Sequence, residues 1–419
     1  GRLGVGSGRG GAQCARPDAK RRRAAAGLGA PVFFVRRRRR GRRRHAGLRC
    51  RRGGRCRQRG SGRDGGCDAA ATAGTIEMFN FGKDKKRTPA EQCAKLAADF
   101  RKREALAPGA AAPASLVEDT SRHLRQLGEI VGRDAAAAAP AILSAGLPAA
   151  LVAHVGDLGA AERRDADDVF IAAMKSEGAD AYLEANKAMV AALCADYASQ
   201  AGAAAGTNAE LHRGIMLREC IRHESGARAA LFAANGDAQA APPLLALFEV
   251  AAADSFDLAS DALETLREAL TTHRSAASTA VLESYTLFFG DFHKLLERGS
   301  YVATRQGLKL LADMLLDEEY IRVMMRYIAE PANLMRTMTL LRNDSDSIAY
   351  EAFHIFKIFV ANPSKPAAIA AILAQNRDKL LAFLGRFQAK REEEDEDFAA
   401  EKALMLETIG ALVVPGAAQ

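Results

Sequence analysis

The chain has 419 residues and a formal net charge of +8, but it divides into two parts of opposite charge. Residues 1–77 hold 22 Lys and Arg against 4 acidic residues, and the remainder holds 37 against 47, so a charge argument for nucleic-acid binding applies to the first part alone. No apolar run reaches the roughly 18 residues of a membrane span, and the cysteines after residue 77 are too few and scattered for a disulfide framework. We therefore expect a cytoplasmic protein.

The first 77 residues form a leader dominated by Gly, Arg and Ala, with the run Arg36–Arg40 and no helical or strand periodicity. Like charges repel and little is apolar, so we expect disorder. The functional interpretations are a nucleic-acid tail, a nuclear address or an organellar transit peptide. The alternative is translated upstream sequence, because the composition changes sharply at Met78. The predicted domains are the leader, 1–77, and a folded part, 78–419.

The folded part is predicted to be a succession of helices. Thr88-Pro89 resembles an N-cap followed by proline at the first helical position. The alanine-rich stretch 135–150 is interrupted by Pro140 and Pro148, which predicts one short helix and a turn. Apolar spacing predicts further helices over Gln92–Leu106, Ser115–Val131, Ala166–Ser176, Ala181–Tyr197, Leu211–His223, Ala332–Leu341, Lys379–Gln388 and Phe398–Leu412.

One pattern occurs three times within Asp254–Pro363. In each copy a small residue precedes a large apolar residue, and further apolar residues follow three and seven positions after that. The small residues are Ala262, Gly307 and Ala352, spaced 45 residues apart. The offsets place the large residues on one side of a helix, and a period of about 40–47 residues is typical of armadillo and HEAT repeats. We therefore predict an all-α, armadillo/HEAT-like helical-repeat solenoid, in which neighbouring repeats cover each other's apolar stripe.

Two segments have a partial likeness to metal sites. Cys220 and His223 have the spacing of half a site, but no second pair of ligands is near in sequence. We interpret Leu211–His223 as a structural helix whose many ions pair with neighbouring repeats. The acidic run Glu392–Asp397 lacks the glycine and spacing of a calcium loop and is interpreted as solvated. The prediction is therefore no metal and no cofactor.

Catalytic motifs are also missing from the sequence. It contains no GxxxxGK[ST], no HExxH and no GxSxG, so we predict neither catalytic residues nor a small-molecule substrate. In a helical solenoid the functional part is usually a surface.

The polar edge of one repeat helix is the candidate surface. Tyr301, Arg305 and Lys309 recur at intervals of four and form a stripe beside the apolar face. An aromatic ring beside two cations is typical of protein-binding surfaces, although an ordinary solvated helix edge is the alternative. The equivalent positions are Phe256, Ser260 and Glu264 one repeat earlier, and Asp346, Tyr350 and His354 one repeat later. Stacked repeats place these positions side by side, which predicts a groove with a basic, aromatic centre.

Ala332–Leu341 carries Leu334, Met338 and Leu341 on one face. Such a stripe usually belongs to the core, but methionine also lines adaptable pockets for peptide side chains.

Several segments resemble the calcium-binding protein 39 family, small armadillo-like scaffolds also called mouse-protein-twenty-five. They are GIMLRECIRHE (Gly214–Glu224), SFDLASDA (Ser255–Ala262), YVATRQGLKLL (Tyr301–Leu311) and EAFHIFKIFVANPSK (Glu351–Lys365). The resemblance extends from about Phe79 to about Leu412 and is stronger after Gly214. The leader has no counterpart in it.

The resemblance implies a non-enzymatic partner of protein kinases of the sterile-twenty class. Family members bind a related pseudokinase and help to assemble an active complex with a liver kinase B-like kinase. Their concave face grips the kinase domain beside its helix C, and a C-terminal pocket takes a Trp-Glu-Phe type tail.

The family's kinase-binding residues match Tyr301, Arg305 and Lys309, and its tail-pocket residues match Met338 and Lys379. The chain departs from the family at Met335 and Gln375, which replace lysines beside the tail pocket, and at Glu318, which replaces a basic residue. These departures affect which tail sequence is preferred and how much electrostatic attraction contributes to the binding affinity. Despite the family's name, no calcium site is visible in the sequence.

Two other functions compete with a kinase-activating scaffold. One is a generic helical-repeat adaptor, and the other is a nucleic-acid-associated protein that acts through its leader. The binding of residues 78–419 alone, measured over a salt series, separates the nucleic-acid-associated protein from the kinase-activating scaffold. Binding that depends on nucleic-acid phosphates would vanish with the leader. An enzyme is disfavoured by the missing motifs.

Overall fold

The computed structural model describes residues 87–107, 110–199, 209–233 and 240–412, which belong to one compact unit, Asp84–Gln419. The leader predicted for 1–77 lies outside the described residues. Every regular element within the described ranges is a helix. The helices are α1 (Pro89–Glu104), α2 (Ala114–Arg133), α3 (Ala135–Ser144), α4 (Leu147–His154), η1 (Val155–Asp157), α5 (Ala160–Met174), α6 (Ala179–Ala185), α7 (Lys187–Ser199), α8 (Ala209–Ile221), α9 (Glu224–Leu231), η3 (Pro243–Ala246), α10 (Leu247–Ala251), α11 (Phe256–Thr271), α12 (Arg274–Glu283), α13 (Tyr285–Arg298), α14 (Tyr301–Leu315), η4 (Glu318–Tyr320), α15 (Ile321–Tyr327), α16 (Pro331–Leu340), α17 (Asp346–Ala361), α18 (Ala367–Gln375), α19 (Arg377–Arg386), α20 (Ala389–Glu394) and α21 (Glu396–Gly410).

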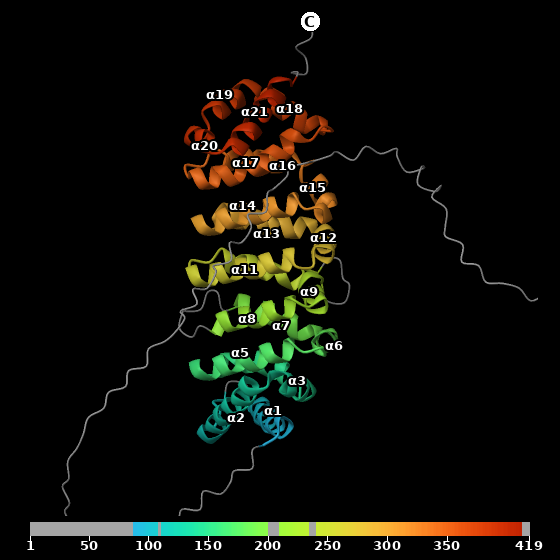
Figure 1. Cartoon of the computed structure of the whole chain (residues 1–419), viewed down its shortest axis with the longest axis vertical. Coiled ribbons are helices and arrows are strands. Elements are labelled where there is room, and N and C mark those ends of the chain that lie inside the picture. The colour runs from blue at the N-terminus through green and yellow to red at the C-terminus, as the bar shows by residue number, and fades with distance from the viewer. Residues whose placement is uncertain (1–86, 108–109, 200–208, 234–239, 413–419) are drawn as a thin grey trace, which may run out of the picture. The chain divides into compact units, whose positions relative to one another are not determined.

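The helices are arranged in successive rows. One row, which we call the helix ladder, consists of α2, α5, α8, α11, α14, α17 and α21, each of which contacts the next (Figure 1). The helices between them also contact in succession, α7 with α10 and then α13, and α9 with α12 and then α15. Three helices therefore recur per repeat through most of the stack. This confirms the predicted all-α helical-repeat solenoid.

The three small residues of the sequence pattern occupy equivalent places on the ladder. Ala262 on α11, Gly307 on α14 and Ala352 on α17 are all buried, as predicted. A Cβ atom at Gly307 would lie only 3.0 Å from Cδ2 of Leu296 on α13. Glycine at this position therefore allows α14 to pack closely against α13.

Ion pairs and one histidine–aspartate contact, which we call clamps, join each step of the ladder from α5 to α21. The partners are about 45 residues apart in the chain, so each clamp joins one repeat to the next. The clamps are His212–Asp167 (2.6 Å), Arg218–Asp261 (2.7 Å), Arg222–Glu268 (2.8 Å), Arg267–Asp313 (3.5 Å), Arg305–Glu351 (3.9 Å) and Lys357–Glu401 (2.7 Å). They confirm the structural interpretation of the charged helix predicted at Leu211–His223.

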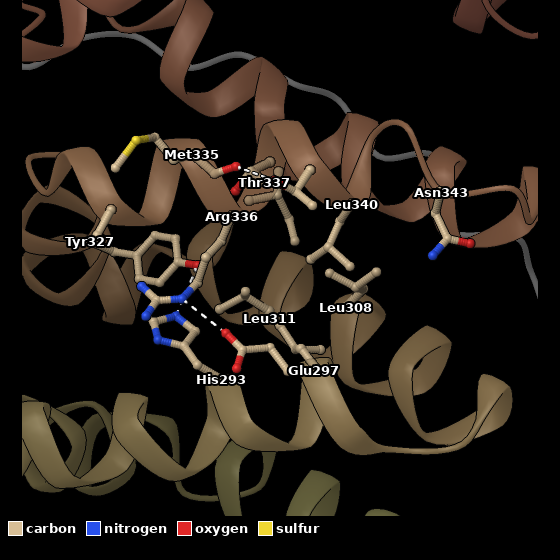
Figure 2. Close-up of a pocket in the computed structure, with 14 residues that line it drawn as sticks. His293, Glu297, Leu308, Leu311, Tyr327, Met335, Arg336, Thr337, Leu340 and Asn343 are labelled. Carbon is tan, nitrogen blue, oxygen red and sulfur yellow. Dashed lines mark hydrogen bonds and ion pairs between the residues drawn. The ribbon is translucent and has the colours of Figure 1, made fainter.

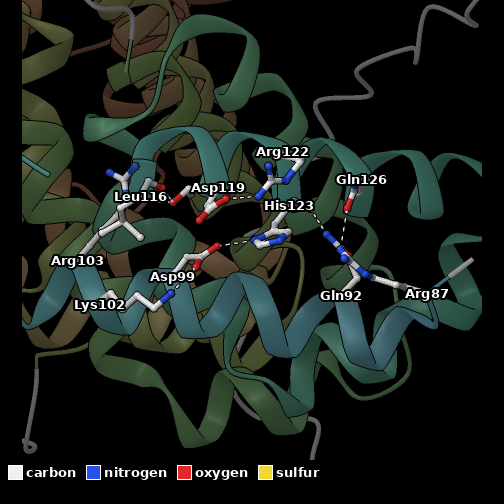
Figure 3. A network of polar contacts seen from close by, with 11 residues as sticks. Arg87, Gln92, Asp99, Lys102, Arg103, Leu116, Asp119, Arg122, His123 and Gln126 are labelled. Atoms are coloured by element: carbon white, nitrogen blue, oxygen red, sulfur yellow. Dashed lines mark hydrogen bonds and ion pairs between the residues drawn. The ribbon is translucent and has the colours of Figure 1, made fainter. Parts of the chain in front are cut away.

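The first two helices are joined by a buried polar network (Figure 3). Nδ1 of His123 on α2 lies 2.6 Å from Oδ2 of Asp99 on α1, and both side chains are buried. The Gln92 amide donates a 2.7 Å hydrogen bond to the carbonyl oxygen of His123. Thr88 caps α1 in a reciprocal box with Glu91, which confirms the predicted helix start.

Two predicted segments are wrong in detail. The stretch 135–150 holds two helices instead of one, because Pro148 stands at the start of α4, where its missing N–H costs nothing, and Gly146 makes the turn at φ 68°. Pro140 lies inside α3. The helix predicted over Ala181–Tyr197 is broken at Asn186, whose side chain donates to the Tyr182 carbonyl and so competes with the helical backbone.

No single helix in the described ranges has the length and apolar character needed to cross a membrane. Among the residues that the structure describes, one combination meets the requirement by length and composition, namely α3 with the segment formed by α4 and η1, and these two segments are bent by 80° relative to each other.

Candidate functional site

The predicted stripe of Tyr301, Arg305 and Lys309, which we call the α14 stripe, lies on the open side of α14. All three residues are exposed, whereas Ala303 and Leu308 on the same helix are buried. The Ser300 hydroxyl accepts a hydrogen bond from the Ala303 amide and so fixes the start of α14 immediately before Tyr301. The structure thus brings the three residues together on one face, as the helical spacing predicts.

Tyr301 lies at the junction of α14 and α17. Its side chain is half exposed, at 50%. Hydrogen bonding with the Ser347 hydroxyl at the beginning of α17 lowers the pKa of the Tyr301 phenol, and the nearby positive charge of Arg305 acts in the same direction. The ring is therefore presented to solvent while its hydroxyl is oriented by the neighbouring repeat.

Arg305 belongs both to the stripe and to the series of clamps. Its Nε lies 3.9 Å from Oε1 of Glu351, which makes this the longest of the six clamps. The Arg305 side chain is 46% exposed, whereas that of Glu351 is 12% exposed. The guanidinium thus has donors available toward solvent while it remains anchored at one side.

The repeat before α14 contributes a shallow pocket of about 280 Å³ between α11 and α14. Phe256, Ser260 and Glu264, which the sequence placed beside the stripe, line this pocket from α11. Val302, Gln306 and Leu310, each one residue beyond a member of the stripe, line it from α14. Phe256 is 65% exposed at its rim, so aromatic surface flanks the stripe on this side.

In the repeat after α14, the positions predicted to continue the groove are in contact with other side chains. Arg391 of α20 places its guanidinium carbon 3.9 Å from the centre of the Tyr350 ring, which also contacts His354 edge-on at 4.6 Å. The Gln388 amide donates to the carbonyl oxygen of Asp346 at 3.0 Å. These contacts join Asp346 and Tyr350 to Gln388 and Arg391, so the open surface is centred on α11 and α14.

Met338 and Lys379, the two predicted tail-pocket residues, lie on different helices. Met338 is half-buried on α16, and Lys379 is exposed on α19. A pocket of about 640 Å³, which we call the α13–α16 pocket, is lined by other residues of α16, including Met335, Arg336 and Leu340 (Figure 2). Neither Met338 nor Lys379 belongs to its lining. Sequence reasoning missed this pocket, because its walls come from five helices.

The Cys220 and His223 pair is occupied by structural contacts. Cys220 is fully buried, and burial raises the pKa of its thiol. Nε2 of His223 lies 2.6 Å from the Met174 carbonyl oxygen. In the part of the chain that the structure describes, no group of three or more His, Cys, Asp or Glu side chains is placed to hold a metal ion.

Comparison with known proteins places these features in a family. The profile of the family described as Mo25-like matches residues 79–413. The chain is 42% identical over 199 residues to "Calcium-binding protein 39-like" of Mus musculus, covering 48% of this chain and 56% of that protein. It is 41% identical over 202 residues to "Degreening-related gene dee76 protein" of Auxenochlorella protothecoides (48% and 60%), and 39% identical over 199 residues to "Mo25-like protein" of Schizosaccharomyces pombe (48% and 58%). The chain thus spans somewhat more than half the length of these relatives.

Proposed function

Since the chain belongs to the Mo25-like family, we propose that its folded part is a non-catalytic scaffold in the cytoplasm that binds and activates a protein kinase or pseudokinase of the sterile-twenty class. In this proposal the α14 stripe contacts the kinase domain, and a liver kinase B-like kinase is a further member of the assembly. The observation that carries the proposal is the exposure of an aromatic ring and two cations together on one ladder helix.

The chemistry of the α14 stripe supports a protein partner. Tyr301 offers apolar area with a polar tip, and Arg305 offers forked donors to a carboxylate or a carbonyl oxygen. Aromatic residues and arginine dominate the energetics of most protein interfaces. The adjoining α11–α14 pocket with Phe256 at its rim extends the apolar contact area beside the stripe.

A solenoid can activate a kinase without any chemistry of its own. A kinase is active only when its helix C is held inward, so that a glutamate of that helix pairs with the lysine that positions ATP. A rigid surface that binds the inward state more tightly than the outward state shifts the population by its differential affinity. The clamped ladder around α14 provides a rigid surface of this kind.

A second attachment strengthens the first in this proposal. Met338 and Lys379 anchor a hydrophobic kinase tail of the Trp-Glu-Phe type at the C-terminal end of the solenoid. Two weak contacts on one rigid body reinforce each other through effective concentration. The family resemblance implies lysine where this chain has Met335 and Gln375, so we expect its tail preference to depend less on acidic residues.

The test separates the two attachments by substitution. Arg305→Ala is expected to lower kinase stimulation and kinase-domain affinity by roughly tenfold, the effect of losing about 1.4 kcal/mol at an interface. Tail-peptide binding should be retained in this variant. Met338→Ala is expected to do the reverse, with binding of a fluorescent Trp-Glu-Phe peptide as its readout.

Arg322→Ala is the matched control, because Arg322 is an exposed arginine on α15 outside both proposed surfaces. Circular dichroism confirms that each variant is folded. If Arg305→Ala and Met338→Ala weaken both readouts equally, the two-surface mechanism is wrong. If no sterile-twenty kinase is stimulated but Arg305→Ala loses another protein partner, the generic adaptor replaces the kinase scaffold.

A further inference from the structure

The α13–α16 pocket has its charged side chains at one end, whereas the other end combines leucines with the amide of Asn343 (Figure 2). Arg336, Glu297, His293 and the Tyr327 hydroxyl gather at one end. Leu308 and Leu340 lie toward the other end. At about 640 Å³ the pocket has the size of sites that enclose small organic ligands, and such sites usually combine an apolar lining with a few convergent polar groups.

A single ion pair spans the polar end. Nε of Arg336 on α16 lies 3.3 Å from Oε1 of Glu297 on α13. The Glu297 side chain is 59% exposed and that of Arg336 is 42% exposed. An ion pair of this exposure contributes little stability, because water competes for both partners. Glu297 can therefore turn outward into solvent at low cost and leave the guanidinium to another anion.

The surroundings of Arg336 favour an anion over a cation. His293 is buried beside it, with Nε2 3.5 Å from the Tyr327 hydroxyl oxygen. Burial first, and then the charge of Arg336, lower the pKa of His293 to about 4, and the opposing effect of Glu297 is smaller. His293 is consequently neutral near pH 7, so Arg336 carries the one positive charge among the residues that line the pocket, and Glu297 carries the one negative charge.

The apolar wall suits a hydrocarbon. It is lined by Leu296 of α13, Leu308 and Leu311 of α14 and Ile355 of α17, and all four residues are buried. Met335 lies at the rim with 54% of its surface exposed. A methionine side chain adapts to ligands of different shape.

We propose that the α13–α16 pocket binds a small amphiphilic anion, with a carboxylate at Arg336 and an aliphatic or aromatic tail against Leu296, Leu308 and Leu311. Neither the α14 stripe nor Met338 and Lys379 line this pocket, although Met335 at its rim is also one of the positions beside the predicted tail pocket. The proposed site concerns a small molecule and does not depend on the proposed kinase partner.

Three probes with the same eight-carbon tail test the proposal: octanoate, 1-octanol and octylammonium. Each is titrated into the full chain carrying ¹³C-methyl methionine, and the Met335 methyl resonance, assigned with Met335→Leu, reports binding at the pocket rim. Met338 lies outside the lining and serves as an internal reference. We expect octanoate to shift the Met335 resonance at concentrations about tenfold lower than the other two probes, because its head group gains a charge-assisted hydrogen bond.

Two substitutions at the ion pair should act in opposite directions. Glu297→Gln removes the competing carboxylate and should tighten octanoate binding severalfold, whereas Arg336→Gln should weaken it about tenfold, to the level of octanol. Arg342→Gln is the control, because Arg342 is an exposed arginine just beyond α16 that does not line the pocket. Equal affinity for the three probes, no Met335 shift, or the same response in Glu297→Gln and Arg336→Gln would each overturn the proposal.

Discussion

The close approach of α14 to α13 at Gly307 makes a quantitative prediction about stability. A Cβ atom there would lie 3.0 Å from Cδ2 of Leu296 and 3.6 Å from Cδ2 of Leu295, whereas carbon atoms pack best at about 3.5–4.0 Å. Alanine at 307 gains about 1 kcal/mol of helix propensity, but the tight contact offsets that gain, so we expect almost no net change. Leucine at 307 adds three more carbon atoms against α13 and should cost roughly 1–3 kcal/mol.

A second glycine in the adjacent helix provides the control. Gly290 in α13 is exposed, and a Cβ atom there would meet nothing within 4 Å. Gly290→Ala should therefore show the propensity gain alone, about 0.5–1 kcal/mol. The assay is urea unfolding followed by circular dichroism. The expected order of stability is Gly290→Ala first, then wild type and Gly307→Ala together, and Gly307→Leu last.

Two results would refute the packing argument. If Gly307→Leu is as stable as wild type, α14 and α13 are not closely packed at this point. If Gly307→Ala gains as much as Gly290→Ala, the contact with Leu296 has no energetic effect.

Three further predictions concern the clamps, a buried histidine and the leader. Asp261→Ala removes the partner of both Arg218 (2.7 Å) and the Tyr197 hydroxyl (2.6 Å) and should cost about 3 kcal/mol in urea unfolding, whereas the exposed Asp257→Ala on the same helix should cost far less. Because the folded-state pKa of His293, about 4, lies below the ordinary 6.5, its contribution to stability is complete above pH 6.5 and decreases as the pH falls toward 4. His293→Gln should remove on the order of 2 kcal/mol of the stability lost between pH 7 and 4.5, as measured by unfolding at both pH values. Deleting residues 1–77 should leave the thermal midpoint of the remainder unchanged, because a segment of that composition cannot bury a core; a lower midpoint would show that it packs against the solenoid.

The sequence predicted the solenoid where large apolar residues mark one helix face. In the helices α11, α14 and α17, leucine and phenylalanine recur around a small residue, so the repeat is visible at its 45-residue interval. Earlier in the chain α5 buries Ala166, Ala172 and Ala173, and alanine does not distinguish a buried face from an exposed one. The ladder therefore extends through α2, α5 and α8, where the pattern was not recognised.

The sequence predicted only those features of the candidate site that depend on a single helix. Exposure of Tyr301, Arg305 and Lys309 follows from their spacing along α14 and the apolar residues between them. The contacts of Arg391 with Tyr350 and of Arg305 with Glu351 join residues more than 40 positions apart, and no local pattern encodes them. The α13–α16 pocket was missed for the same reason.

The clamped ladder also determines where the folded part should open most readily. In a stack held by nearest-neighbour contacts, a helix with ladder neighbours on both sides is protected twice, and one at the edge of the stack only once. Amide hydrogen exchange should therefore be slowest in α11 and α14 and faster in α2 and α21. The helix that carries Tyr301 and Arg305 would then be among the last to fluctuate, so a partner would bind a preformed surface and lose little affinity to ordering it.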